Sequence, residues 1–430
     1  MTQTRNGITI KRDPHRLLTS IAIAFLSVAI LAVFIDNKLC VIFGPIIALL
    51  LCYLFFFGYS ETVIAIVLVA NDALGTIAFG KISFPYLLLV LVAIKFVMGK
   101  SYSVVEYAFI VVSALLACQL FFLESISLKQ VLYSVAFIVA LVLIGKSKEG
   151  RERFFQGVAL TVVLISLHTC ITGGVEFYSQ NQFSEEYLRK GILGVGIGDS
   201  NYSCFLLNVG LICLWYDDKT HWGIKTIATL PILYAMTVTL STSGILSLII
   251  ILALGILLGK NKPKATVLLL IVVLVIVMVF SLYIGLPSEM HLESVDAYIL
   301  RMTEKLNALV EGNLDEATTN RSGLLVSHLQ YYVNQPLIKM LFGGNGVIAV
   351  DNTAPHNTYI GYLLQIGLVG TFFFFGYAAV RFIKCCNKKT DFNNWRRSIL
   401  LKVLCLFVAT NLSLCEGSLW SMWMYFLFIL

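Results

Sequence analysis

The chain has 430 residues, of which 58% are hydrophobic and 13% charged, and its mean hydropathy is +0.87. A soluble globular domain typically has about 25% charged residues, so the composition excludes that class. We expect an all-α polytopic membrane protein. The net charge of +7 is typical of Lys- and Arg-rich cytoplasmic loops and by itself indicates no acidic partner.

The N-terminal residues are partly basic and lead directly into a full-length apolar run without a small-residue cleavage site. They predict a first membrane helix rather than a removed signal peptide. Apolar runs long enough to cross a bilayer continue along most of the chain, and they predict about 12–14 spans. The fourteen segments are 17–35, 39–58, 62–79, 83–98, 104–123, 129–145, 154–172, 200–216, 223–241, 243–259, 265–285, 357–381, 398–414 and 417–430.

Basic residues gather in alternate loops, at 11–16, 146–153, 219–225, 260–264 and 381–397. Such loops face the cytoplasm in membrane proteins, which predicts a cytoplasmic N-terminus. We therefore divide the chain into a membrane part, 1–285, with a smaller external loop near 173–199, a large external loop, 286–356, and a C-terminal membrane part, 357–430.

The large external loop is expected to be ordered, although it contains no cysteine and hence no disulfide. Apolar residues recur at helical spacing over 293–310, which predicts an amphipathic helix on the membrane face or on the bundle. A second helix is predicted over 320–334, with Pro336 ending it. Arg321 and His328 are seven residues apart and would share one face of that helix.

The same loop carries the strongest candidates for chemistry. The guanidinium of Arg321 suits phosphate oxygens, and the imidazole of His356 can accept a proton near neutral pH. Gly343, Gly344 and Gly346 permit a tight turn between them. Each residue alone has a simpler explanation, since Arg321 can be a solvated helix residue and His356 a helix-start residue.

The smaller external loop ends in Arg189, a glycine-rich run over 191–198, and Asp199-Ser200-Asn201 at the start of an apolar helix. Backbone N–H groups at such a helix start can bind an anion. Helix capping by Asp199 or Ser200 explains those two residues equally well.

Other sites are less favoured by the sequence. Asp72 and His168, polar residues within apolar runs, are the groups that a transporter would use. Lys95 lies near the inner end of its span and is expected to reach the membrane surface without a further role. Glu185, Glu186 and Asp351 lack the paired spacing of a metal site, so we expect neither a metal nor another cofactor. Nothing indicates nucleic acid as a partner.

Several of these segments resemble a known family. Arg321 at a helix start, LFGGNGV at 341–347, His356-Asn357 and YIGYLLQIGLVG at 359–370 resemble the C-terminal half of the O-antigen ligase and Wzy-type O-antigen polymerase superfamily, whose members are bacterial membrane glycosyltransferases. The segment LRKGILGVGIGDSN at 188–201 is similar to the other signature of that superfamily. Where members often carry an arginine, this chain has Gly244.

The resemblance implies a GT-C-like fold and transfer of a glycan from a polyprenyl-diphosphate donor to a sugar hydroxyl. His356 would then be the general base, and Arg321 and Arg189 would hold the departing diphosphate. We expect further substrate contacts from Asn201, His328, Asn357, Gly344 and Gly346.

We therefore expect an O-antigen polymerase of the bacterial inner membrane that joins lipid-linked repeat units on the outer face. An O-antigen ligase and a protein O-oligosaccharyltransferase share the donor and differ in the acceptor. A lipid-linked glycan transporter or flippase is the alternative from another class. The expected partners are the polyprenyl-diphosphate-linked oligosaccharide, membrane lipid, a chain-length regulator and a flippase.

Overall fold

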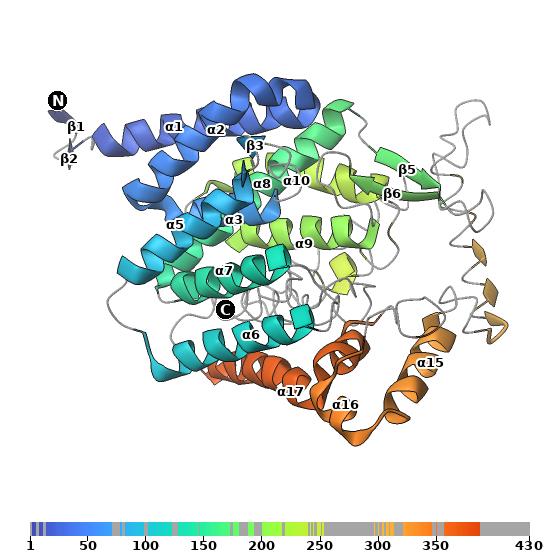
Figure 1. Cartoon of the computed structure of the whole chain (residues 1–430). Helices are drawn as coiled ribbons and strands as arrows, with labels where there is room; N and C mark the ends of the chain where they lie inside the picture. Colours follow the sequence, from blue (N-terminus) through green and yellow to red (C-terminus); the bar gives the residue numbers. More distant parts are fainter. Residues whose placement is uncertain are drawn as a thin grey trace.

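The structure is a computed structural model that describes a bundle of helices with three short hairpins (Figure 1). The described residues are 2–5, 8–11, 14–70, 78–79, 82–98, 102–122, 128–145, 147–172, 175–179, 188–192, 200–216, 220–239, 241, 244, 247–250, 252, 296, 300, 303–304, 307–308, 310–313, 321–345, 350 and 357–387.

The described part is mostly helical, as the composition predicts. The helices of the first half are α1 (Pro14–Ile35), η1 (Asn37–Leu39), α2 (Cys40–Leu54), η2 (Phe55–Tyr59), α3 (Ser60–Val69), α5 (Phe84–Met98), α6 (Val104–Phe122), α7 (Leu128–Gly145), α8 (Lys148–Thr172), α9 (Ser200–Tyr216) and α10 (Trp222–Val238). The later helices are α15 (Arg321–Val333), α16 (Leu337–Phe342) and α17 (Thr358–Asn387). The described residues within 296–310 are also helical, which agrees with the helix predicted there.

Three short antiparallel hairpins were not predicted. They are β1 (Thr2–Arg5) with β2 (Ile8–Lys11), β3 (Ala78–Phe79) with β4 (Ile82–Ser83), and β5 (Val175–Ser179) with β6 (Leu188–Ile192). The β5–β6 pair lies in the smaller loop, where Tyr178 stands opposite Arg189. Each hairpin is short and local, so it does not appear as an apolar run of membrane length.

Three helices in the described part are long and apolar enough to cross a membrane. They are Leu18–Ile35, Cys40–Val69 and Glu149–Thr172. The first of them exposes large apolar side chains such as Phe25 and Val28. A water-facing surface of that kind is unfavourable, whereas lipid would cover it. These helices indicate a membrane-associated protein; the predicted spans at 265–285, 398–414 and 417–430 lie outside the described residues.

The second of these stretches differs from the prediction of two separate spans at 39–58 and 62–79. Helix α2 leads into the π-helical segment η2, in which Phe57 and Gly58 leave helical geometry. Gly58 has a φ of 95°, a backbone conformation that glycine adopts readily. Helix α3 then begins at Ser60 and ends at Val69, so it has 10 residues and is shorter than predicted.

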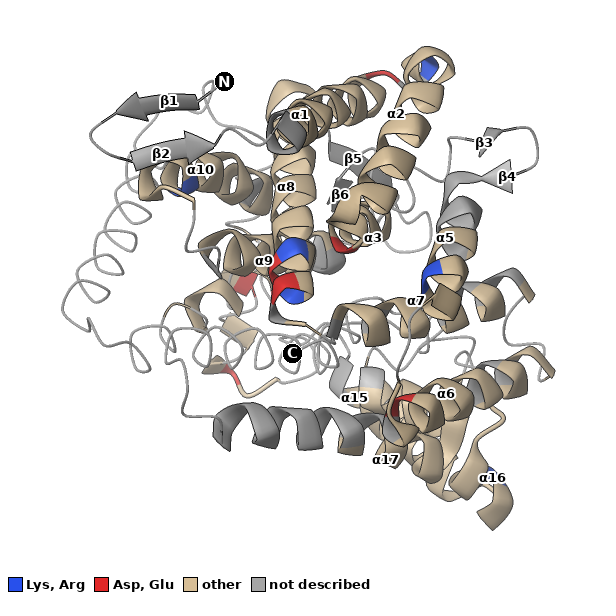
Figure 2. Cartoon of the chain, turned by 90° about the vertical axis from the view of Figure 1, so that its left-hand side faces the viewer, with Lys and Arg blue, Asp and Glu red and all other residues tan. Residues whose placement is uncertain are grey.

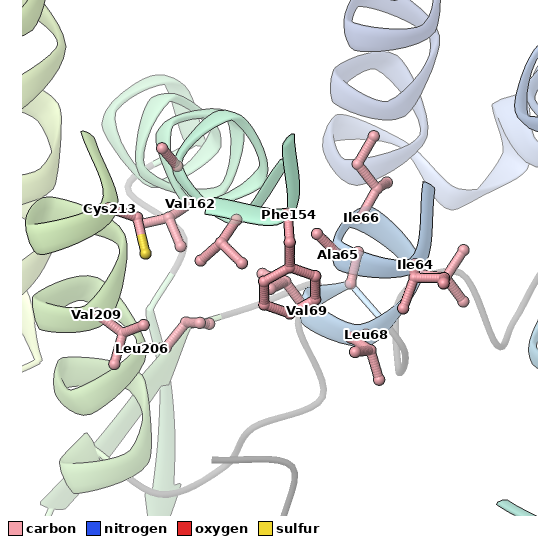
Figure 3. Packing of buried hydrophobic residues seen from close by; sticks show 14 of the residues in the cluster. Ile64, Ala65, Ile66, Leu68, Val69, Phe154, Val162, Leu206, Val209 and Cys213 are labelled. Carbon is pink, nitrogen blue, oxygen red and sulfur yellow. The ribbon is translucent and has the colours of Figure 1, made fainter. Parts of the chain in front are cut away.

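The core of the bundle lies where α3 packs against α8, and α8 against α9 (Figure 3). Every residue of α3 except Glu61 is buried. Gly157 of α8 lets α3 approach closely, since a Cβ there would lie 2.7 Å from the Cβ of Ala65. Gly210 of α9 does the same for Val162 of α8. Small residues at such crossings are typical of helices that associate in membranes.

Charged side chains meet near the start of α3 and α8 (Figure 2). Lys95 of α5 forms an ion pair with Glu61, whose Oε1 lies 3.1 Å from the Lys95 Nζ, and it also donates to Ser60 Oγ. The expectation that Lys95 has no role beyond reaching the surface was wrong. A partner 34 residues earlier in the chain keeps the ammonium within the bundle.

A second cation stabilises the η2 turn next to this pair. Arg153 of α8 donates to the carbonyl oxygen of Gly58 and pairs with Glu149 at 2.6 Å. Its guanidinium carbon lies 5.0 Å from the centroid of the Tyr59 ring, a cation–π distance. The turn between α2 and α3 is therefore held from the α8 side.

The two ion pairs predict unequal effects on stability. Glu61→Gln removes the charge opposite Lys95, whose side chain is 34% exposed. We expect the free energy of unfolding to fall by about 1–3 kcal/mol, which is less than the 3–5 kcal/mol typical of breaking a fully buried ion pair. Glu149→Gln removes an exposed partner and should cost less than about 1 kcal/mol. Heating detergent-solubilised variants and measuring the folded fraction by gel filtration tests this; equal losses would contradict it.

Candidate functional site

The predicted external helix is present as α15, which begins at Arg321 and ends at Val333, with Pro336 as the N-cap of α16. His328 lies on α15 and is fully buried. Its Nδ1 is 2.7 Å from the carbonyl oxygen of Leu324. Because a carbonyl only accepts hydrogen bonds, Nδ1 carries a proton. In this arrangement His328 serves the packing of its helix, and contact with a substrate stays a prediction.

Helices α15, α16 and α17 share a small apolar cluster. Tyr332, Ile360 and Leu364 form its buried centre. The hydroxyl of Tyr332 donates to the carbonyl oxygen of Met340 at 2.6 Å, which holds α15 and α16 at a fixed angle. Burial raises the pKa of Tyr332, so the hydroxyl remains a donor at neutral pH. The elbow between the two helices is therefore well defined.

Helix α17 is interrupted, whereas the sequence predicts one continuous span over 357–381. At Gly367 φ is 67° and ψ is −176°, a conformation essentially restricted to glycine. The interruption leaves carbonyl groups before it without their usual helical partners. Backbone N–H groups of the loop after α16 take that place: Gly344 donates to Gln365 and Asn345 to Leu364, each at 3.1 Å.

Two glycines let the loop approach the interruption this closely. A Cβ at Gly343 would lie 2.6 Å from the backbone nitrogen of Gly367, and a Cβ at Gly367 would lie 2.5 Å from the carbonyl carbon of Leu341. Gly343 also has a positive φ, 76°. We call the packing of Gly343 and Gly344 against Gly367 the glycine contact. The glycine contact joins two segments named separately above, LFGGNGV at 341–347 and YIGYLLQIGLVG at 359–370.

Gly367 was missed as a site residue. The signal was present, because an isolated glycine within a predicted helix often marks a packing requirement. Gly344, in contrast, was predicted to belong to the site, and the structure places its backbone against α17. Gly346 lies outside the described residues.

Two buried polar groups near the glycine contact have no hydrogen-bond partner within the part of the chain that the structure describes. Asn345 is only 5% exposed, and its Nδ2 is unpaired. The Oγ1 of Thr371 is unpaired as well. A helical threonine usually bonds the carbonyl four residues earlier, but that residue is Gly367, where the helix is interrupted. Buried donors of this kind normally bind a protein group, water or ligand.

Asn357 caps the start of α17. Its Oδ1 accepts a hydrogen bond from the N–H of Ile360 at 3.2 Å, the usual geometry of an N-cap. The preceding residue, His356, lies outside the described residues. Between 345 and 357 the structure describes only Val350. Both ends of this interval contact α17: the N–H of Asn345 donates a hydrogen bond to Leu364, and Asn357 caps the helix.

For three further predicted site residues, the structure describes the backbone but not the side chain. Arg321 begins α15, Arg189 lies in β6 and Asn201 in the first turn of α9. Figure 1 shows β5–β6 and α15–α16 at the same, right-hand end of the molecule, while the N-terminus lies at the opposite end. The elements that carry the two predicted arginines are therefore on one side of the bundle.

Gly244 has a structural reason to lack a side chain. A Cβ there would overlap the Cβ and Sγ of Cys204. Its N–H donates to Ser241 Oγ at 3.1 Å, and its carbonyl accepts from Asn208 Nδ2 at 3.0 Å. An arginine at this position would not fit between α9 and the turn in this structure.

This packing predicts the effect of Gly244→Ala. The added methyl group should destabilise the protein by about 1–3 kcal/mol through overpacking. Cys204→Gly removes the opposing atoms, so the double variant should lose less stability than the two single variants added together. Thermal unfolding of the four proteins gives the interaction energy, and strict additivity would show that the two residues do not meet.

His168, the residue that a transporter would use, is buried in α8. Its ring lies edge-on to Phe34 of α1, 6.1 Å between centroids, and its Nε2 is 3.4 Å from Thr172 Oγ1. Its Nδ1 has no hydrogen-bond partner among the described residues. Asp72 lies outside the described residues. Among the described side chains, no group of three His, Cys, Asp or Glu residues is placed to hold a metal ion.

Comparison of the chain with protein-family models, with curated proteins and with solved structures finds no match.

Proposed function

We propose that the protein is a multi-pass membrane glycosyltransferase of the bacterial inner membrane that joins polyprenyl-diphosphate-linked repeat units, as an O-antigen polymerase does. The observation that carries the proposal is the glycine contact. It brings LFGGN at 341–345 against QIG at 365–367, two segments of the family resemblance that lie about twenty residues apart.

In the proposed reaction His356 takes the proton from the acceptor hydroxyl. The acceptor oxygen attacks the anomeric carbon of the donor sugar, and the bond from that carbon to the diphosphate oxygen breaks with inversion. Arg321 and Arg189 stabilise the negative charge on the departing diphosphate. Asn345, with its unpaired buried amide, is a further donor next to the loop.

The proposed topology has a cytoplasmic N-terminus, about 12–14 spans and the intervals 173–199 and 286–356 outside. It is supported by the position of β5–β6 and α15–α16 at one end of the bundle (Figure 1). A GT-C-like arrangement belongs to the same proposal.

The proposal is tested with purified protein in liposomes that contain a lipid-linked repeat unit and a metal chelator. We expect products of two or more repeats on one lipid, with release of polyprenyl diphosphate. A ligase would instead require a core-sugar acceptor. Absence of any new glycosidic bond with either acceptor would overturn the proposal.

Transport of a lipid-linked glycan is the second candidate, and it is favoured by the buried, unpaired Nδ1 of His168. The same liposomes distinguish the two functions, because a flippase moves labelled glycan lipid between leaflets without forming a bond. Loss of that movement in His168→Ala, with His356→Ala unaffected, would favour transport.

A further inference from the structure

Helix α15 has one broad apolar stripe. Leu325 and Tyr332, on one side of the stripe, pack in the cluster shared with α17. Val326, Leu329 and Val333, on the adjoining side of the same stripe, are exposed. The apolar stripe of an amphipathic helix normally faces an apolar surrounding over its whole width. The exposed side of the α15 stripe therefore requires a cover.

The exposed stripe continues onto α16. We define the outer patch as Val326, Leu329, Val333, Leu337, Ile338 and Phe342, whose exposed fractions lie between 42% and 71%. The hydrogen bond from Tyr332 to Met340 fixes the elbow between the two helices that carry these residues. Exposed large apolar side chains that gather on neighbouring helical turns mark an interaction site.

The outer patch carries little charge. Between 322 and 345 the chain has one Lys, Arg, Asp or Glu residue, which is Lys339 on α16. Its side chain is exposed beside Ile338. A single cation on a long apolar stem suits a lipid headgroup, since the stem lies along the acyl region while the ammonium reaches the phosphate.

The patch is also continuous with apolar surfaces of two bundle helices. Gln119 of α6 donates to the carbonyl oxygen of Phe342, which places the end of α16 against the end of α6. Phe122 of α6 and Phe372 of α17 are exposed there. Figure 1 shows α6 and α17 side by side with α16 at their end, and the stacked rings of Phe109 and Phe373 join them.

We infer that the outer patch is seated in the outer leaflet of the membrane, with its apolar side chains among lipid acyl chains and Lys339 at the phosphates. The inference rests on the proposed topology, which places 286–356 outside. Its consequence for the proposed enzyme is that the loop at 341–345 lies at the depth of the lipid headgroups, where the diphosphate of a lipid-linked donor is located.

Site-specific photocrosslinking tests the inference in intact membranes. Benzoylphenylalanine replaces Ile338 in one variant and Val333 in a second, and Glu311, an exposed residue of the same external interval, in a control. After irradiation, mass spectrometry of the purified protein identifies the adducts. We expect phospholipid adducts at 338 and 333 at a yield at least about fivefold above that at 311, as for side chains within the acyl boundary.

Three results would overturn the inference: equal lipid yields at all three positions, a covalent dimer, which would identify a second copy as the cover, or an adduct with another protein. Yields are compared only for monodisperse protein, so a misfolded variant does not imitate a negative result. The readout requires no glycan synthesis, and it can therefore fail or succeed independently of the liposome assay for polymerisation.

Discussion

Gly343→Ala and Gly367→Ala should each destabilise the protein and abolish its activity. Each adds a Cβ at a positive φ and directs it onto backbone atoms of the facing segment, which cannot move aside as a flexible side chain would. Backbone strain and overpacking together should cost about 2–6 kcal/mol. Heating detergent-solubilised protein and following the monodisperse fraction measures the loss.

Gly312→Ala is the matched control for this prediction. Gly312 also has a φ of 76°, but a Cβ there would meet nothing within 4 Å. The variant therefore loses stability through the positive φ alone, without the overlap. That loss is about 1 kcal/mol for a residue in the left-handed region. A loss as large as that of Gly343→Ala would mean that the glycine contact contributes little and that backbone strain alone explains the effect.

His356→Ala should reduce glycan polymerisation by about 100-fold or more, because a general base typically contributes 10²–10⁴-fold. In cells that lack their own polymerase, the native chain should restore long surface glycans. At equal membrane abundance the variant should leave single repeats. Gel electrophoresis of the surface glycan measures the chain length.

His221→Ala is the control for the loss of an imidazole. His221 is exposed at the start of α10, and its Nδ1 accepts a hydrogen bond from the N–H of Gly223. We expect long glycans from this variant. Long glycans from His356→Ala would contradict the catalytic role, and failure of single repeats to reach the surface with native protein would favour transport.

Helix positions could be predicted where an apolar run ends at polar residues. Helix α9 spans the predicted range, and the predicted ends of α6 and α7 differ by one residue. The interruption at Gly367 could not be predicted from its own segment, because it depends on hydrogen bonds from Gly344 and Asn345 elsewhere in the chain. Lys95 was misjudged for the same reason, since its partner lies on another helix.

In the candidate site, the contact between the loop after α16 and residues 364–367 of α17 was not predicted. Gly344, a predicted site residue, takes part in it through its backbone. The burial of His328 was not evident, because periodicity alone does not say which side of the broad apolar stripe of α15 turns inward. The roles of His356, Arg321 and Arg189 stay predictions.

The near-complete burial of α3 has a consequence for the order in which the protein is made. Much of its surface is covered by α8, whose buried face begins near Phe154, roughly ninety residues later in the chain. At a synthesis rate of about 5–20 residues per second, that delay is on the order of 5–20 seconds. The carboxylate of Glu61 likewise precedes its partner Lys95. During biogenesis α3 therefore waits without its main partner, and the insertion machinery or a chaperone can cover the exposed surface until α8 arrives.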